Sequence, residues 1–230
     1  MKKKSSAKEL ILKTLKDKSH VKQQVYDNLT EAFNIIKEVL QNLSKDYNKD
    51  LRQEDKRIFL EYKDRGAFEA ELKVAADMII FNMHSNIFEF ERGHTVWKTE
   101  YVQSNEMSTY CGIINIYNFL ADSFKYNRID DLGYLIARIF INKDNHYFVE
   151  GKRQLGFLYN DFSTAIIDKS AVKNIIESTI LYSLDFDLLV PPYDNVKIAT
   201  VAQMRERINK SKIQTGKRLG FVFYPDDDQV

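Results

Sequence analysis

The sequence predicts an α+β protein with a central antiparallel sheet, flanked by helices and preceded by a long N-terminal helix. Two observations carry this prediction. The first fifty residues place apolar side chains at spacings of three and four, and the chain then changes to strict alternation. Runs of strand-like segments flanked by helix-like segments are typical of the α+β class.

The N-terminal segment is expected to be helical. Ser6 and Glu9 have the spacing of a capping box, which starts a helix. A longer helix is predicted over residues 19–43, because apolar side chains from Val21 to Leu43 form one stripe. Such a helix is about 35–40 Å long at 1.5 Å per residue. It either buries its stripe across the sheet or projects and meets a second copy.

An antiparallel meander is predicted next. Residues 58–63 and 68–74 alternate apolar and charged side chains around the turn-forming Asp64-Arg65-Gly66, which indicates a hairpin. Further strands are predicted at 77–84 and 87–91, and residues 95–103 are expected to extend the sheet.

The second half of the chain is expected to mix helices and strands. Apolar spacing predicts a helix over 110–126, and strands are predicted at 133–142, 146–152 and 154–162. A helix beginning at Asp168 or Ser170 should end before the prolines at 191 and 192. A short helix at 199–210 and a last strand at 217–225 complete the prediction. The expected domains are an N-terminal helical segment (1–50), a core (51–226) and an acidic tail (227–230).

Composition narrows the class of protein. Hydrophobic residues make up 44% of the 230 residues, which is enough for a substantial core. The chain has no run of eighteen apolar residues, so neither a membrane span nor a membrane partner is expected. The basic N-terminus breaks into an amphipathic pattern rather than a signal peptide. Cys111 is the single cysteine and leaves no disulfide framework. These features favour the cytoplasm.

Charge is segregated along the chain. Residues 1–24 contain eight lysines against two acidic residues, and residues 202–218 contain six Lys or Arg against Glu206. The middle of the chain is correspondingly acidic. This distribution suggests that nucleic acid or another anionic partner is attracted to the basic segments.

Two nearly identical stretches reinforce this hypothesis: the chain reads EGKRQLGFLYND at 150–161 and TGKRLGFVFYPD at 215–226. If both were neighbouring strands, their cations would share one end of the sheet and form an anion site. The alternative is that Lys and Arg simply keep strand ends soluble. The candidate anion-binding residues are Lys152, Arg153, Arg205, Arg207, Lys210, Lys212, Lys217 and Arg218.

Catalytic signals are weak. Glu69, Glu71 and Lys73 alternate on one predicted strand with the spacing of a Mg²⁺-dependent nuclease centre, but an exposed strand face produces the same pattern by chance. Glu89, Glu91 and His94 are close enough in sequence for a metal, although they fit better as a strand end entering a turn. No metal site or cofactor is therefore predicted.

The favoured function is a non-enzymatic binding or interaction protein that recognises a polyanion or nucleotide-like ligand through its basic segments. The alternatives are a Mg²⁺-dependent nuclease-like enzyme and a sensor domain with an aromatic small-ligand pocket between sheet and helix. Self-association through the N-terminal helix is a further expectation.

Overall fold

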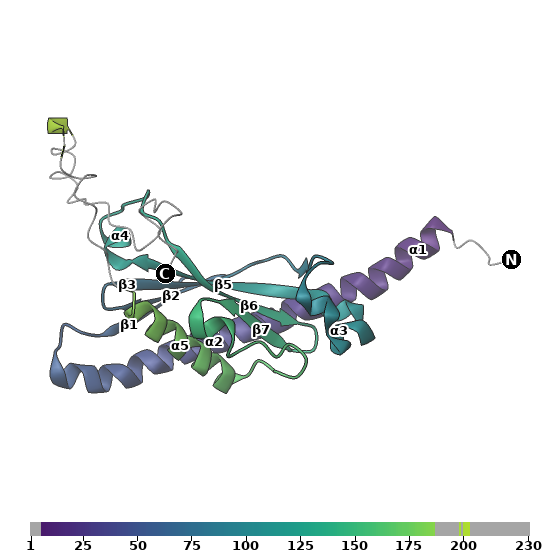
Figure 1. The fold of residues 1–230 in the computed structure, drawn as a ribbon, viewed down its shortest axis with the longest axis horizontal. Helices are drawn as coiled ribbons and strands as arrows, with labels where there is room; N and C mark the ends of the chain where they lie inside the picture. The colour runs from purple at the N-terminus through teal and green to yellow at the C-terminus, as the bar shows by residue number, and fades with distance from the viewer. Residues whose placement is uncertain (1–5, 187–197, 199, 203–230) are drawn as a thin grey trace, which may run out of the picture.

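An antiparallel sheet forms the centre of the protein in this computed structural model, which describes residues 6–186, 198 and 200–202 (Figure 1). The sheet has seven strands in the order β1-β2-β3-β5-β6-β7, with β4 also paired to β5. The strands are β1 (Leu60–Asp64), β2 (Glu69–Val74), β3 (Asp77–Met83), β4 (Phe88–Glu89), β5 (Tyr110–Leu120), β6 (Tyr134–Asn142) and β7 (Tyr147–Gly151). The structure thus confirms the predicted α+β class.

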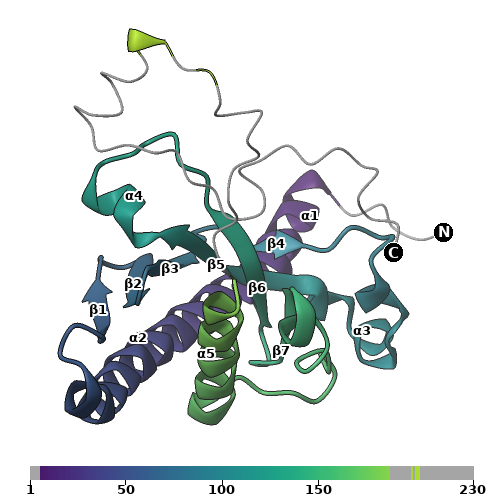
Figure 2. The same ribbon diagram turned by 60° about the vertical axis from the view of Figure 1, so that its left-hand side comes forward.

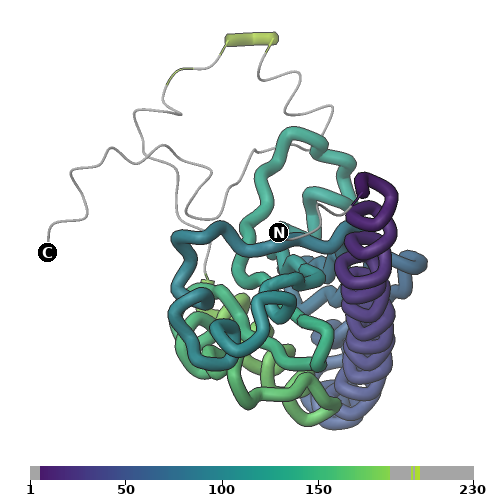
Figure 3. Tube along the Cα trace, turned by 90° about the vertical axis from the view of Figure 1, so that its right-hand side faces the viewer, coloured from purple at the N-terminus to yellow at the C-terminus, as the bar shows by residue number. Residues whose placement is uncertain are grey.

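The N-terminal region is one long rod beside the sheet (Figure 3). It comprises α1 (Ala7–Thr14), a π-helical turn (Leu15–Ser19) and α2 (His20–Glu54). The predicted capping box is present, because the Ser6 hydroxyl accepts from the Glu9 N–H and the Glu9 carboxylate accepts from the Ser6 N–H. The helix runs past its predicted end at residue 43, so the expected domain boundary near residue 50 falls within α2 and stays a prediction.

Two helices, α2 and α5 (Lys169–Leu184), cover the same face of the sheet (Figure 2). The predicted stripe of α2 is buried there, and α5 adds a second apolar stripe. The alternating apolar side chains of the strands meet both helices and form the main core. The fully buried large side chains of this core include Leu29, Phe33, Ile36, Leu40, Leu72, Ile79, Phe81, Ile114, Ile116, Ile139 and Ile141.

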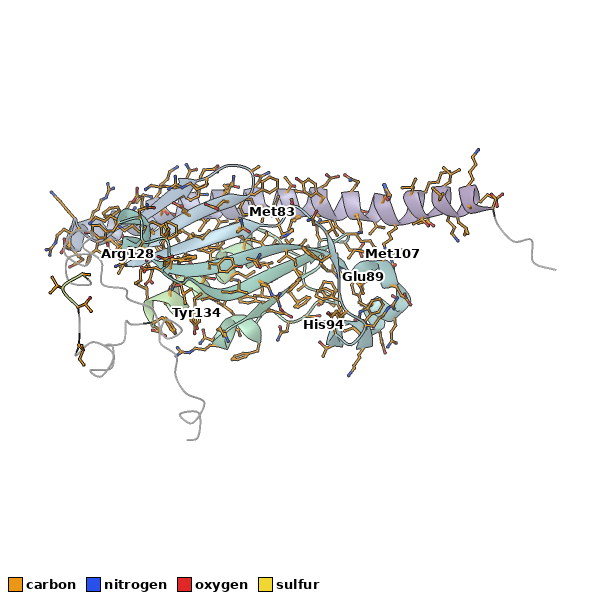
Figure 4. The ribbon with its side chains drawn as sticks, turned by 90° about the horizontal axis from the view of Figure 1, so that it is seen from above. Met83, Glu89, His94, Met107, Arg128 and Tyr134 are labelled. Carbon is orange, nitrogen blue, oxygen red and sulfur yellow. The ribbon has the colours of Figure 1, made fainter. Side chains whose placement is uncertain are left out.

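The first helical turns behave differently from α2. Neither α1 nor the π-helical turn contains a buried residue, and the two project beyond the sheet (Figures 1 and 4). The helix predicted over residues 19–43 therefore buries its stripe on the sheet, and it is the shorter helical segment before it that projects. Self-association through this region remains a prediction.

The predicted helix over residues 110–126 is wrong, because residues 110–120 form β5 and only Ala121–Lys125 are helical (α4). β5 lies in the middle of the sheet and is at least half-buried on both faces. A strand covered on both sides carries apolar residues on both faces, so their spacing also fits a helix.

Two further predictions are corrected. Residues 95–103 do not extend the sheet but form a 3₁₀ turn (Thr95–Lys98) and α3 (Glu100–Ser104), capped by the side chains of His94 and Thr99. Residues 154–162 are not a strand, because β7 ends at Gly151 and a 3₁₀ turn (Arg153–Gly156) follows. Arg153 has a φ of 49°, a left-handed conformation that ends an extended strand.

The hairpin of β1 and β2, the strand β3, the pair β6–β7 and the helix α5 agree with the sequence. The fourth strand is shorter than predicted and covers only Phe88–Glu89. The predicted helix at 199–210 lies almost entirely outside the described residues, as does the strand at 217–225. Within the described part of the chain, no helix combines the length and apolarity needed to cross a membrane.

Candidate ligand-binding site

A pocket lies on the face of the sheet opposite α2 and α5, beside β4. We call it the β4 pocket. Its volume is about 610 Å³, within the range of pockets that hold small organic ligands. It is lined by Phe88, Glu89, Phe90, Glu91, Gly93, His94, Cys111, Ile113, Arg138, Phe140 and Glu150. Figure 4 shows two of these, Glu89 and His94, at the α3 end of the sheet.

The register of three strands builds the floor of the pocket. Ile113 on β5 lies opposite Phe140 on β6, and Arg138 on β6 lies opposite Glu150 on β7. Side chains alternate between faces along a strand, so Arg138 and Phe140 share the face that Ile139 does not. The Arg138 guanidinium binds the Glu150 carboxylate directly across the two strands.

A cluster of aromatic rings forms the apolar part of the wall. Phe90 lies 5.0 Å from Phe140 and 5.6 Å from Phe148, measured between ring centroids. Phe140 and Phe148 stack at 4.8 Å with their planes 15° apart. Phe162 closes the cluster, 5.2 Å from Phe148. These contacts hold the segment after β4 against the sheet, and this segment shapes the pocket.

His94 joins the aromatic wall to the charged floor. Its ring stacks on Phe90 at 4.6 Å with an angle of 26°. The N–H of Val96 donates to Nδ1 of His94, at 3.3 Å, so the ring proton is on Nε2. Nε2 then donates to Oε1 of Glu150, at 3.4 Å. Each oxygen of Glu150 therefore has its own partner, Arg138 or His94.

The charges of the lining are predominantly negative. Three carboxylates, those of Glu89, Glu91 and Glu150, face a single guanidinium, that of Arg138. Glu89 accepts a hydrogen bond from the Tyr110 hydroxyl at 2.9 Å. Glu91 is exposed, and no described residue pairs with its carboxylate. A net negative wall attracts a cationic group.

Polar side chains lead across the same face of the sheet to the pocket. Strand pairing sets five of them side by side, one on each successive strand: Glu69, Asn82, Asn115, Arg138 and Glu150. All five are half-buried. The middle of this face, outside the pocket, is therefore partly exposed to solvent, as is usual for an antiparallel sheet with one covered face.

Cys111, at the back of the pocket, is an inert lining residue. It is 1% exposed, and this burial raises the pKa of its thiol well above the ordinary value. A neutral thiol is a poor nucleophile. Cys111 thus contributes apolar surface to the pocket.

Trp97 is attached to the outside of the pocket wall. Its indole N–H donates to the carbonyl of Phe90 at 3.1 Å. The guanidinium of Arg92 lies over its ring at 3.8 Å from the centroid. Since the chain has a single tryptophan, this residue is a specific spectroscopic reporter of the pocket.

The residues of the nuclease hypothesis lie together on β2, on the face away from the helices. Glu71 is bound by Arg65 at 2.9 Å, and Lys73 lies over the ring of Phe59 at 5.8 Å. The described residues contain no group of three or more His, Cys, Asp or Glu side chains arranged to hold a metal ion. Glu71 is buried and its charge is balanced by Arg65, whereas Glu69 is half-buried.

Only two of the candidate anion-binding residues lie in the described part of the chain. Lys152 is exposed, and Arg153 approaches Asp185 at 3.7 Å and the ring of Tyr182 at 5.7 Å. The other six, from Arg205 to Arg218, lie outside the described residues. Adjacency of the two repeated stretches and polyanion recognition both stay predictions.

The sequence did not predict the β4 pocket, although three residues of its wall were weighed as a metal site and judged to fit better as a strand end entering a turn. Glu89, Glu91 and His94 were recognised as neighbours, and the structure places all three on its wall, although not as a metal site. Arg138 and Glu150 were not recognised, because they reach the pocket only through the pairing of β6 with β7. Each residue is the single charged side chain of an otherwise uncharged strand, and this was the available signal.

Comparisons with known proteins add no assignment: no family model matches the chain, and no similar curated protein or solved structure is found.

Proposed function

We propose that the protein is a binding protein for a small organic molecule, held in the β4 pocket, with a flat apolar body and an amine. The negative, aromatic lining of the pocket is the observation that carries this proposal. This proposal corresponds to the sensor domain among the hypotheses drawn from the sequence. That hypothesis placed the aromatic pocket between sheet and helix, whereas the β4 pocket lies on the opposite face of the sheet.

The shape and the rings of the pocket support the apolar body of the ligand. Phe88, Phe90 and Phe140 border a space of about 610 Å³. Aromatic rings favour offset or edge-on contact with another ring, and such contacts contribute about 0.5–1.5 kcal/mol beyond simple burial. A ligand with one or two rings suits these walls.

The charge of the lining supports the amine. Glu150 already binds Arg138 and His94, so its charge is balanced within the protein. Among the described side chains, Glu91 has no cationic partner, and Glu89 pairs with Lys18 at 4.0 Å. An ammonium group near these carboxylates gains from both and from the faces of the phenylalanines, through cation–π attraction of about 0.5–1 kcal/mol.

Titration of the fluorescence of Trp97 tests the proposal. We expect 2-phenylethylamine to change the emission in a saturable way, with a dissociation constant on the order of 1 mM or tighter. The matched probes 2-phenylethanol and 3-phenylpropanoate keep the ring and lose or reverse the charge. They should bind more weakly, and equal binding of the three would contradict the role of the carboxylates.

A pair of variants locates the effect. Glu91→Gln keeps the shape of the wall and removes the unbalanced charge, so it should weaken amine binding about three- to fivefold, the equivalent of 0.7–1 kcal/mol. Glu100→Gln is the matched control, because Glu100 is an equally exposed carboxylate on α3 outside the pocket. An equal loss of affinity for the amine in both variants would place the amine outside the β4 pocket.

A further inference from the structure

The strand β1 is a free edge of the sheet. Register with β2 pairs Leu60 with Val74 and Tyr62 with Leu72. Leu60 turns its N–H and C=O outward, since both bind Asn48 and not β2. Backbone groups alternate in direction along an antiparallel strand, so those of Tyr62 also point away from the sheet.

The opposite edge of the sheet is covered. On β7 the N–H of Tyr147 donates to the carbonyl of Ala165, and that of Val149 donates to the carbonyl of Tyr159. Within the described residues, β1 is therefore the outer strand whose edge lies open. An open edge is a template for another extended chain.

Asn48 on α2 occupies the edge at Leu60, so the open part of the edge begins at Tyr62. Its amide donates to the Leu60 carbonyl at 2.7 Å, and its carbonyl oxygen accepts from the Leu60 N–H at 2.7 Å. The side chain thus repeats the pair of hydrogen bonds that a neighbouring strand makes. The backbone of Tyr62, two residues on, has no described partner.

A groove runs between this edge and the C-terminal half of α2. Its volume is about 920 Å³. Both carboxylates of the lining already have cationic partners: Asp46 pairs with Lys49 at 2.8 Å, and Glu61 pairs with Lys63 at 3.0 Å. Lys45 and Arg52 are exposed, and no described carboxylate pairs with either. Phe59 and Tyr62 supply apolar surface between them.

We propose that this groove binds an extended acidic peptide segment of a partner protein, which adds to the sheet beside β1. Its backbone pairs with Tyr62, and its alternate carboxylates face Lys45 and Arg52. Strand addition in a groove between a sheet edge and a helix is an established mode of peptide recognition. The site is separate from the β4 pocket and does not depend on it.

The same charges argue against a second copy of this chain as the occupant. Two copies paired through β1 would bring the unpaired cations of both grooves to one interface, where they repel each other. An acidic segment neutralises them instead.

Fluorescence anisotropy with synthetic peptides tests the proposal. The probe is a labelled hexapeptide of alternating valine and glutamate, and the matched control peptide carries lysine in place of glutamate. We expect saturable binding of the acidic probe to the full chain and about tenfold weaker binding of the lysine peptide. Equal affinity for both peptides would overturn the proposal.

Two sets of variants assign the contacts. Lys45→Gln with Arg52→Gln should weaken the acidic probe about tenfold. Lys13→Gln with Lys16→Gln removes the same charge from the projecting helix, and this control should bind as the unaltered protein does. Equal weakening in the two pairs would mean that overall charge, not the groove, attracts the peptide. Tyr62→Pro removes the ring and also an N–H that β2 does not use, so it should lower affinity further than Tyr62→Ala, which removes the ring alone.

Hydrogen exchange of the Tyr62 amide in the unaltered protein tests the same contact without a substitution. The amide should exchange rapidly in the free protein and slow at least tenfold with the acidic probe bound. Unchanged exchange on binding would place the peptide elsewhere. A Tyr62 amide already protected in the free protein would show that the edge is occupied by the chain itself or by a second copy, and would overturn the proposal.

Discussion

Asn142 shows how one buried polar residue organises the turn behind the β4 pocket. It is fully buried, and its carbonyl oxygen accepts from the N–H groups of Asp144 and His146. Its amide donates to the Tyr101 hydroxyl at 2.8 Å. Asn28 on α2 donates to the backbone carbonyl of Asn142, so the turn is tied to the long helix as well. A satisfied network of this kind fixes one conformation, because leaving any member unpaired is costly.

Two half-buried tyrosines make stability depend on pH in the alkaline range. Burial, with the Glu177 carboxylate beside it, raises the pKa of Tyr47 from 10.0 to about 12. Burial and Asp144 raise the pKa of Tyr101 to about 12 as well. Because both pKa values are raised in the folded state, their stabilisation is present below pH 10 and is lost as pH rises through about 12.

We therefore expect the free energy of unfolding to fall between about pH 10 and 12, and to fall less in the variant Tyr47→Phe with Tyr101→Phe. Urea unfolding at a series of pH values measures both slopes. The free energy of unfolding of each protein is compared with the value of that same protein at pH 8. The two hydrogen bonds that the variant lacks therefore do not affect the comparison of slopes. Parallel slopes in the two proteins would contradict the account.

Single residues were predictable where the signal is local. Two helix caps could be recognised from residues no more than four apart in the sequence. These are the capping box of Ser6 and Glu9 and the cap at Asp168, and the structure confirms both. The Arg138–Glu150 pair depends on which strands are neighbours. Short-range patterns do not contain that information, so this part of the pocket was missed.

At the scale of elements, α2 and β5 pack closely against each other at Gly112. A Cβ atom added at Gly112 would lie 2.6 Å from Cδ2 of Leu29 and 2.9 Å from its Cγ. Leu29 is fully buried, so it has little room to move. The absence of a side chain at Gly112 allows the helix to lie this close to the sheet.

Gly112→Ala should therefore destabilise the protein by about 1–3 kcal/mol, the usual cost of overpacking a core. Gly93→Ala is the control, because a Cβ there meets nothing within 4 Å. Thermal or urea unfolding of the two variants measures the change in the free energy of unfolding that each substitution causes. A loss of less than about 0.5 kcal/mol for Gly112→Ala would show that α2 lies further from β5 than the structure has it.

The β1–β2 hairpin at the edge of the sheet was predicted better than the central strand β5. The β1–β2 hairpin has one covered face and alternates cleanly, so its pattern indicated a strand. β5 alternates between fully and half-buried positions, and its apolar residues fit either period. Gly112, Asn115 and Asn118 weaken a helical interpretation of this segment, since Gly and Asn are poor helix formers.

At the scale of the whole molecule, the two faces of the sheet have different roles. One face carries α2 and α5 and supplies most of the core. The other carries the second apolar cluster, formed around Phe140, Phe148 and Phe162, with the β4 pocket beside it. The covered face supplies most of the core, and the partly open face carries the β4 pocket.

The class of the fold followed from the change of period near residue 50, and the structure confirms it. The segregation of charge did not locate a site within the described residues. Arg153 is close to Asp185, and the cations from Arg205 onward lie outside the described part of the chain. Charge along a sequence shows what a protein attracts, but a site also needs the fold to bring the charges together.

Chemical-shift mapping of the amide resonances, with 2-phenylethylamine as the probe, tests the central claim most directly. The account predicts saturable shifts concentrated at Phe88–Glu91, His94, Ile113, Arg138 and Glu150, with β1 and β2 unaffected. Shifts scattered over the surface, or centred on the face covered by α2 and α5, would contradict the claim that the β4 pocket is the binding site.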